Sequence, residues 1–186
     1  MWDVIVIGGG VAGLQTAVFT AKAGEETLVI DSGDSLVTST DKIQNLLTEE
    51  RIAGEEILDR GRKRVQSFDG DIREATIDRA ERIDDGFRVF SADDEFDGKT
   101  IVVASADNYD YLESLDLEFE PGREGEFMLE QHIATDEGNR AADGVYIAGL
   151  ANTWEYQTAV AIGNGAKAAV NLLSDKRDEA YVDHDY

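Results

Sequence analysis

The stretch from Val4 to Asp31 restricts the fold of this chain more than any other part of the sequence. It opens with the β-branched run Val4–Ile7, which is typical of a strand buried on both faces of a parallel sheet. Glycines follow at once, and Val11–Ala23 then has the small and apolar residues of a helix that Gly24 would end. A second apolar run, Thr27–Ile30, predicts the next strand. The stretch therefore predicts a β-α-β unit with a tight turn after its first strand.

The glycines of that turn have the spacing of a dinucleotide-binding site. Gly8, Gly10 and Gly13 fit G-x-G-x-x-G: the first glycine permits the turn, the second lets backbone approach a pyrophosphate, and the third lets the helix pack closely on the strand. The amides at the start of the helix would face the phosphates. Asp31, roughly 20 residues past the glycines, can accept hydrogen bonds from a ribose. The alternative, a glycine-rich turn in a ligand-free unit, leaves this acid unexplained.

A second glycine pattern lies near the end of the chain. Gly163, Gly165 and Ala168 spell G-x-G-x-x-A, but the preceding Gln157–Ile162 has alanine and valine at helical spacing, and no strand leads into the glycines. We therefore predict close helix packing through small residues rather than a second nucleotide site.

Length and composition favour one domain with one cofactor. A chain of 186 residues, 42% of them hydrophobic, can bury one sizeable core. It has no cysteine, which excludes thiol redox chemistry, thiolate metal ligands and disulfides on this chain. Any redox role would then belong to the cofactor, and neither a metal-ligand spacing nor a nucleophile motif is present.

The charge of the chain is strongly negative. Forty acidic residues against 17 basic ones give a formal net charge of -23, spread along the sequence. This spread favours a carboxylate-coated surface suited to high salt and a halophilic, haloarchaeal source, although an ordinary acidic protein remains the alternative. We do not expect nucleic acid as a partner, because a polyanion would be repelled and the sequence has no basic stripe with interleaved aromatic residues.

Targeting signals are missing from the sequence. No apolar run approaches the roughly 20 residues of a membrane span, and no basic segment precedes the first apolar run. We expect a cytoplasmic protein with no membrane partner.

The overall pattern predicts an α/β fold, Rossmann-like, with a central parallel sheet, helices and a small antiparallel β-meander. We expect a single domain over 1–186, with halves 1–106 and 126–174 joined by a connector, 107–125, and followed by an acidic tail, 175–186. The expected helices after the first are Gly54–Phe68 and Tyr156–Leu173. The expected strands are Ile72–Ile77, Glu81–Ile83 and Phe87–Phe90, all antiparallel, and Thr100–Ala104, Phe127–Leu129 and Val145–Ala148.

Several segments resemble the flavin domain of the thioredoxin reductase family. They are DVIVIGGGVAG at Asp3–Gly13, AGEEIL at Ala53–Leu58, TIVVA at Thr100–Ala104, TDEGNRAADGVYIAG at Thr135–Gly149 and YQTAVAIGNGAKAA at Tyr156–Ala169. In that family an NADPH domain with a redox-active cysteine pair is inserted between the two halves. Here only the short connector joins them.

The resemblance implies a bound FAD. Its pyrophosphate would lie at the glycine turn, its adenosine ribose at Asp31, and its flavin ring near Gln157 and, with weaker alignment, Asn45. Two positions depart from the family: its Ala-Thr-Gly is Ala104-Ser105-Ala106 here, and Leu150 replaces the aspartate that meets the ribityl chain. Together the pattern and the resemblance imply these cofactor-binding residues: Gly8, Gly10, Val11, Ala12, Gly13, Asp31, Ser32, Asn45, Ala104, Gly149, Leu150, Gln157 and Thr158.

Two classes of function follow from the resemblance. One is a minimal FAD-dependent oxidoreductase, a homodimer that exchanges electrons with a ferredoxin-like or other redox partner, a transiently bound nicotinamide or a small molecule. The other is a flavin-binding or flavin-free interaction module that has lost turnover, which the two departures favour. The sequence indicates no catalytic partner for His132, so we expect it to be an ordinary connector or edge residue rather than a general acid or base. Trp154 and Tyr156 would shield the flavin or pack a dimer surface, and we favour packing.

Overall fold

A parallel sheet forms the centre of the structure, a computed structural model that describes residues 1–106, 108–123 and 129–183. The first strand lies in the middle of this sheet, which explains why Val4 to Ile7 is apolar on both faces. At one edge, β9 (Arg140–Ala142) pairs antiparallel with its neighbour. The parallel strands follow the order β3 (Asp71–Glu74), β2 (Thr27–Asp31), β1 (Trp2–Ile7), β6 (Glu95–Val103) and β10 (Val145–Ile147).

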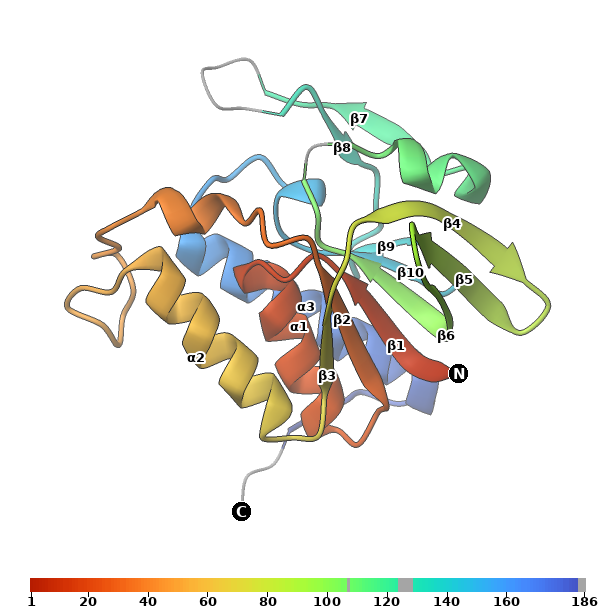
Figure 1. Ribbon diagram of the computed structural model, residues 1–186, viewed down its shortest axis with the longest axis horizontal. Coiled ribbons are helices and arrows are strands. Elements are labelled where there is room, and N and C mark those ends of the chain that lie inside the picture. The colour runs from red at the N-terminus through yellow and green to blue at the C-terminus, as the bar shows by residue number, and fades with distance from the viewer. Residues whose placement is uncertain (107, 124–128, 184–186) are drawn as a thin grey trace.

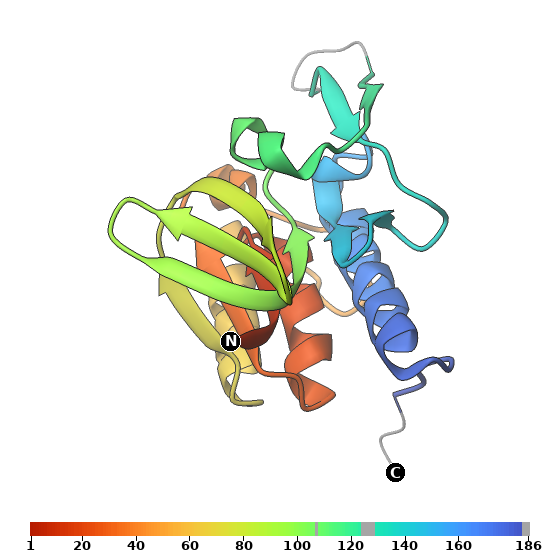
Figure 2. The ribbon, with the colours of Figure 1, turned by 90° about the vertical axis from the view of Figure 1, so that its right-hand side faces the viewer.

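Different structures cover the two faces of the sheet (Figures 1 and 2). Because successive side chains of a strand point to opposite faces, Ile5 and Ile7 belong to one buried cluster while Val4 and Val6 belong to another. The first cluster is completed by a β-meander and the second by three helices. The result is a three-layer domain with the parallel sheet in the middle, and the expected fold class is confirmed.

The helices form one outer layer. α1 (Val11–Lys22) begins directly after the glycine turn, and the chain leaves it through Gly24, which has a positive φ of 88°. α2 (Gly54–Gln66) is amphipathic and buries Leu58 and Val65. α3 (Thr158–Arg177) extends past the expected end at Leu173, so residues 175–177 are helical rather than part of a tail. None of the helices in the described ranges combines the length and apolarity needed to cross a membrane.

The β-meander covers the opposite face. It consists of β4 (Ile77–Ile83), β5 (Gly86–Ser91) and the first half of β6, paired antiparallel in that order. One expectation was wrong: Ile72–Ile77 is not an antiparallel strand. β3 ends at Glu74 and pairs in parallel with β2, because the α2 crossover returns the chain in the same direction. Ile77 instead begins the meander.

The connector contains more structure than the sequence indicated. A 3-10 helix, η2 (Asp110–Leu115), is followed by β7 (Phe119–Pro121), which pairs antiparallel with β8 (Gln131–Ile133). The expected strand Phe127–Leu129 lies outside the described residues except for Leu129, which is not in a strand. Figure 1 shows this hairpin and η2 beside the carboxyl ends of the parallel strands.

Candidate functional site

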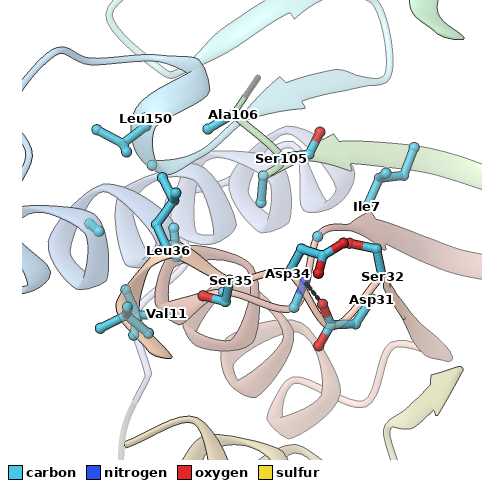
Figure 3. A pocket seen from close by; sticks show the side chains of 18 of the residues that line it. Ile7, Val11, Asp31, Ser32, Asp34, Ser35, Leu36, Ser105, Ala106 and Leu150 are labelled. Carbon is cyan, nitrogen blue, oxygen red and sulfur yellow. Dashed lines mark hydrogen bonds between the residues drawn. The ribbon is translucent and has the colours of Figure 1, made fainter. Parts of the chain in front are cut away.

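A large cavity of about 1250 Å³ opens at the carboxyl ends of the parallel strands. Open α/β sheets bind ligands at this edge, and the volume exceeds the roughly 300–1,000 Å³ of ordinary small-molecule pockets, so a dinucleotide has room. In Figure 3, Asp31 and Ser32 lie on one side of the cavity and Leu150 lies across from them. Between these two ends lies the glycine turn that connects β1 to α1.

Close backbone contacts require glycine at two positions of this turn. Gly8 has a φ of 110°, and a Cβ on it would lie 2.8 Å from the carbonyl oxygen of Ala104. A Cβ on Gly13 would lie 1.9 Å from the carbonyl oxygen of Gly8, so α1 can approach β1 only with glycine there. These two glycines serve the fold.

Gly10 is different because the fold does not require it. Its φ of -70° suits any residue, and a Cβ there would meet only Ser35 Oγ, at 3.3 Å. The missing side chain instead leaves the N-terminal end of α1 open to the cavity, where backbone amides and the helix dipole favour an anion. This cradle fits a pyrophosphate.

Asp31 is fixed by donors from three elements. Its Oδ1 accepts hydrogen bonds from the Gly9 amide at 3.3 Å and the Gly33 amide at 3.1 Å. Its Oδ2 accepts from Arg62 Nη2 of α2, also at 3.1 Å. The carboxylate is buried, and it points along the wall of the cavity with lone-pair capacity left on Oδ2. A ribose hydroxyl can donate to that oxygen.

A pair of amide side chains stands at the other end of the cavity. Asn45, from the loop after β2, donates from Nδ2 to Oε1 of Gln157 at 2.7 Å, across 112 residues of sequence. Gln157 is the N-cap residue of α3, and Thr158 begins the helix. The pair leaves the Asn45 carbonyl oxygen and the Gln157 amide nitrogen able to bond a polar ring edge. Tyr156 also lines this end, whereas Trp154 stacks with Arg123, whose guanidinium carbon lies 4.0 Å from the ring centroid.

The turn that follows β10 lines the cavity on the side across from Asp31. Gly149 has a φ of 66°, and its amide donates to Asn164 Oδ1 of α3 at 2.8 Å. A Cβ on Gly149 would lie 2.8 Å from the Cβ of Ala12. Leu150 therefore presents an apolar side chain where a carboxylate stands in the resembling family.

His132 supports this turn from outside the cavity. It lies in β8, is 7% exposed, and its Nδ1 lies 2.9 Å from the Leu150 carbonyl oxygen. Because a carbonyl can only accept, His132 donates from Nδ1. It does not line the cavity, so the expected structural position agrees with the geometry.

The structure brings the expected site residues together. All of them line the cavity except Gly13, which lies behind Gly8. The second glycine pattern lies within α3, where a Cβ on Gly165 would lie 2.2 Å from the Ala12 carbonyl oxygen, so the prediction of helix packing is confirmed. Sequence reasoning missed Tyr111 and the segment 75–78, which also line the cavity, and Arg62, which donates to Asp31. Arg62 is one of many charges on an amphipathic helix, and no pattern distinguished it.

The fold and site together define a class: an α/β domain of the dinucleotide-binding type, with its parallel sheet between a layer of helices and a β-meander. The model of the pyridine nucleotide-disulphide oxidoreductase family matches residues 2–165. The chain belongs to this family, whose members are flavin-dependent. The resemblance seen in the sequence is confirmed, and the absence of cysteine agrees with a member that has no redox-active pair.

Individual relatives give the same result. A thioredoxin reductase from Aquifex aeolicus is 36% identical over 109 residues, which are 56% of this chain and 34% of that protein. The chain spans about a third of the length of the curated relatives it matches. A thioredoxin reductase structure from Gloeobacter violaceus superposes with a TM-score of 0.80 at 17% identity, covering 100% of this chain and 98% of that chain. The structure of a ferredoxin-flavin thioredoxin reductase from Clostridium acetobutylicum superposes with a TM-score of 0.74 at 16% sequence identity, covering 96% of this chain and 99% of that chain. At these identities the structural likeness shows the fold.

Proposed function

We propose that this chain is a minimal FAD-binding domain that passes electrons between a donor and an acceptor without thiol chemistry of its own. The observation that carries the proposal is Gly10: its side chain is absent where the fold would accept one, and this absence opens the end of α1 to the cavity. When bound, FAD would supply the redox chemistry. The protein's residues would bind and orient it.

Each end of the cavity has a defined task in this proposal. The amides at the start of α1 would neutralise the pyrophosphate, and Asp31 would accept from the adenosine ribose. The Asn45–Gln157 pair would hold the edge of the flavin ring through the remaining amide donor and acceptor. Leu150 would exclude water beside the ribityl chain without bonding it.

The short connector is the reason for proposing an electron donor other than NADPH. The family's NADPH domain would have to be inserted where this chain has only residues 107–125. In the second glycine pattern, Gly165 and Ala168 are buried in the packing of α3. A ferredoxin-like protein or a small reductant would therefore reduce the flavin faster than NADPH. Anaerobic stopped-flow reduction compares them, and fast, saturable reduction by micromolar NADPH would contradict the proposal.

The cradle is tested by Gly10→Leu, with Gly163→Leu as the matched control. Gly163 is exposed on α3, and a Cβ there would meet nothing within 4 Å. In high salt, the wild type and the control should carry the absorption bands of oxidised flavin or take up added FAD. Gly10→Leu should lose FAD binding by at least about tenfold while keeping its circular dichroism spectrum. A wild type that binds no FAD would end the proposal.

A second candidate function is a flavin-binding interaction module without turnover. The observation that favours it is Leu150, which removes a polar contact from the reactive half of the site. The two candidates separate in the reduction experiment. A protein that binds FAD but exchanges electrons no faster than free FAD with every donor would be such a module.

A further inference from the structure

The connector places an aromatic side chain in the cavity wall. η2 is anchored by Leu112 and Leu115, which are 2% and 5% exposed, and by the Ser114 hydroxyl, which donates to the Ala80 carbonyl oxygen of β4. This anchored turn carries Tyr111, which lines the cavity. An aromatic ring on a fixed turn offers a binding surface that needs little reordering.

Tyr111 is held beside the glycine turn. Its hydroxyl lies 2.6 Å from Ser105 Oγ. Ser105 in turn lies against Gly8, since a Cβ on Gly8 would be 2.8 Å from the Ser105 amide nitrogen. The hydroxyl end of the ring is thus tied to the Ser105 side chain, next to the pyrophosphate cradle.

The apolar surroundings of Tyr111 reach the Asp31 end of the cavity. Tyr111 packs against the apolar cluster that contains Ile7, Ile30 and Ile77, and all three also line the cavity. The segment 75–78 runs alongside Asp31, because the Ala75 amide donates to the Asp31 carbonyl oxygen at 3.1 Å. These contacts place the apolar wall next to the carboxylate that would hold the adenosine ribose.

We propose that Tyr111 is the aromatic wall for the adenine ring, a specificity-determining residue for the adenosine half of the ligand. The inference rests on the proposed function for the placement of the ribose at Asp31. A purine attached to that ribose extends into the apolar wall lined by Ile30, Ile77 and Tyr111. Flat bases stack on tyrosine rings, and removing such a ring weakens binding by about tenfold. The Tyr111–Ser105 bond fixes the ring without contacting the base.

The test measures ADP and FAD binding separately, by calorimetry in high salt, for the wild type and three variants. Tyr111→Ala should weaken ADP and FAD binding by about tenfold each. Tyr111→Phe should restore both to within about threefold, since the ring remains, and Ser105→Ala should behave in the same way. Circular dichroism spectra check that every variant is folded.

Each result has a defined meaning. Unchanged ADP binding in Tyr111→Ala would overturn the inference, and so would a loss in Tyr111→Phe as large as in Tyr111→Ala, which would make the hydroxyl the important group. A wild type that binds ADP but not FAD would contradict the flavin function while the variants still decide the role of Tyr111. A wild type that binds neither would contradict both.

Discussion

Asp31 has more hydrogen-bond donors around it than a ribose-binding carboxylate needs. Two backbone amides already fix Oδ1, and Arg62 adds a cation at Oδ2. The side chain of Asp31 is 10% exposed and that of Arg62 is 33% exposed, so the pair lies at the margin of the protein interior. Burying a carboxylate there without a partner is costly. We infer that Arg62 mainly stabilises the buried Asp31 carboxylate.

Replacing Arg62 tests this role. Arg62→Ala should lower the free energy of unfolding by about 1 kcal/mol, because the Asp31 carboxylate loses its charged donor. Asp59→Ala is the control, since Asp59 is 65% exposed and lies 3.4 Å from the other Arg62 nitrogen. It should change stability by no more than about 0.5 kcal/mol. Urea unfolding of both variants makes the comparison, and equal losses would contradict this role for the Arg62–Asp31 pair.

At the scale of elements, α3 is attached to the sheet by a partly buried polar contact. The Tyr146 hydroxyl of β10 donates to Asp175 Oδ2 of α3. Burial, followed by this hydrogen bond to a carboxylate, raises the pKa of Tyr146 above its ordinary value. The folded protein therefore favours the protonated phenol.

This contact predicts an alkaline limit to stability. Since the pKa of Tyr146 is raised by folding, its contribution is complete below the ordinary tyrosine pKa of about 10 and is lost as pH rises toward the folded-state value. The loss amounts to at most about 1.4 kcal/mol per pH unit. Between pH 9 and 11 the melting temperature of Tyr146→Phe should fall less steeply with pH than that of the wild type. Tyr156→Phe, at an exposed tyrosine, should keep the wild-type slope.

Elements differ in how well the sequence predicts them. The β1–α1–β2 unit was predictable to within a residue or two, because its glycines, periodicity and acid all act within a short stretch. β3 was assigned the wrong direction because a strand's partner depends on the crossover that precedes it and not on its own residues. Tyr111 entered the site through η2, which contains charged residues and no clear period. The Asn45–Gln157 bond joins distant segments, and only the family resemblance indicated both of its members.

At the scale of the whole molecule, charge and apolar surface act in opposite directions. A net charge of -23 repels a second copy, while Leu47 and Val160 are exposed, and Leu47 lines a small hollow between the loop after β2 and the start of α3. We propose this apolar surface as a dimer contact, which the family resemblance also implies. Salt is needed to screen the carboxylates before such a contact can form.

A salt series tests both parts of this proposal. The screening length falls from about 10 Å at 0.1 M to about 3 Å at 1 M, so the melting temperature should rise over that range. Sedimentation should show dimers in high salt, and Leu47→Asp should shift them to monomers without lowering the melting temperature of the monomer. Monomers at every salt concentration would contradict the proposed dimer. A melting temperature that stays constant or falls with added salt would contradict the proposed halophilic adaptation.

The central position of β1 sets the order of events while the chain is being made. Its neighbour on one side, β2, follows soon after it in the sequence, but its neighbour on the other side is β6, paired from Trp2 with Gly98 to Ile7 with Val103. At about 5–20 residues per second, the ribosome needs on the order of 5–20 s to supply that second partner. For this time the nascent chain presents an unpaired strand edge that is apolar from Val4 to Ile7. β1 therefore has to be protected from other chains until residue 103 has emerged.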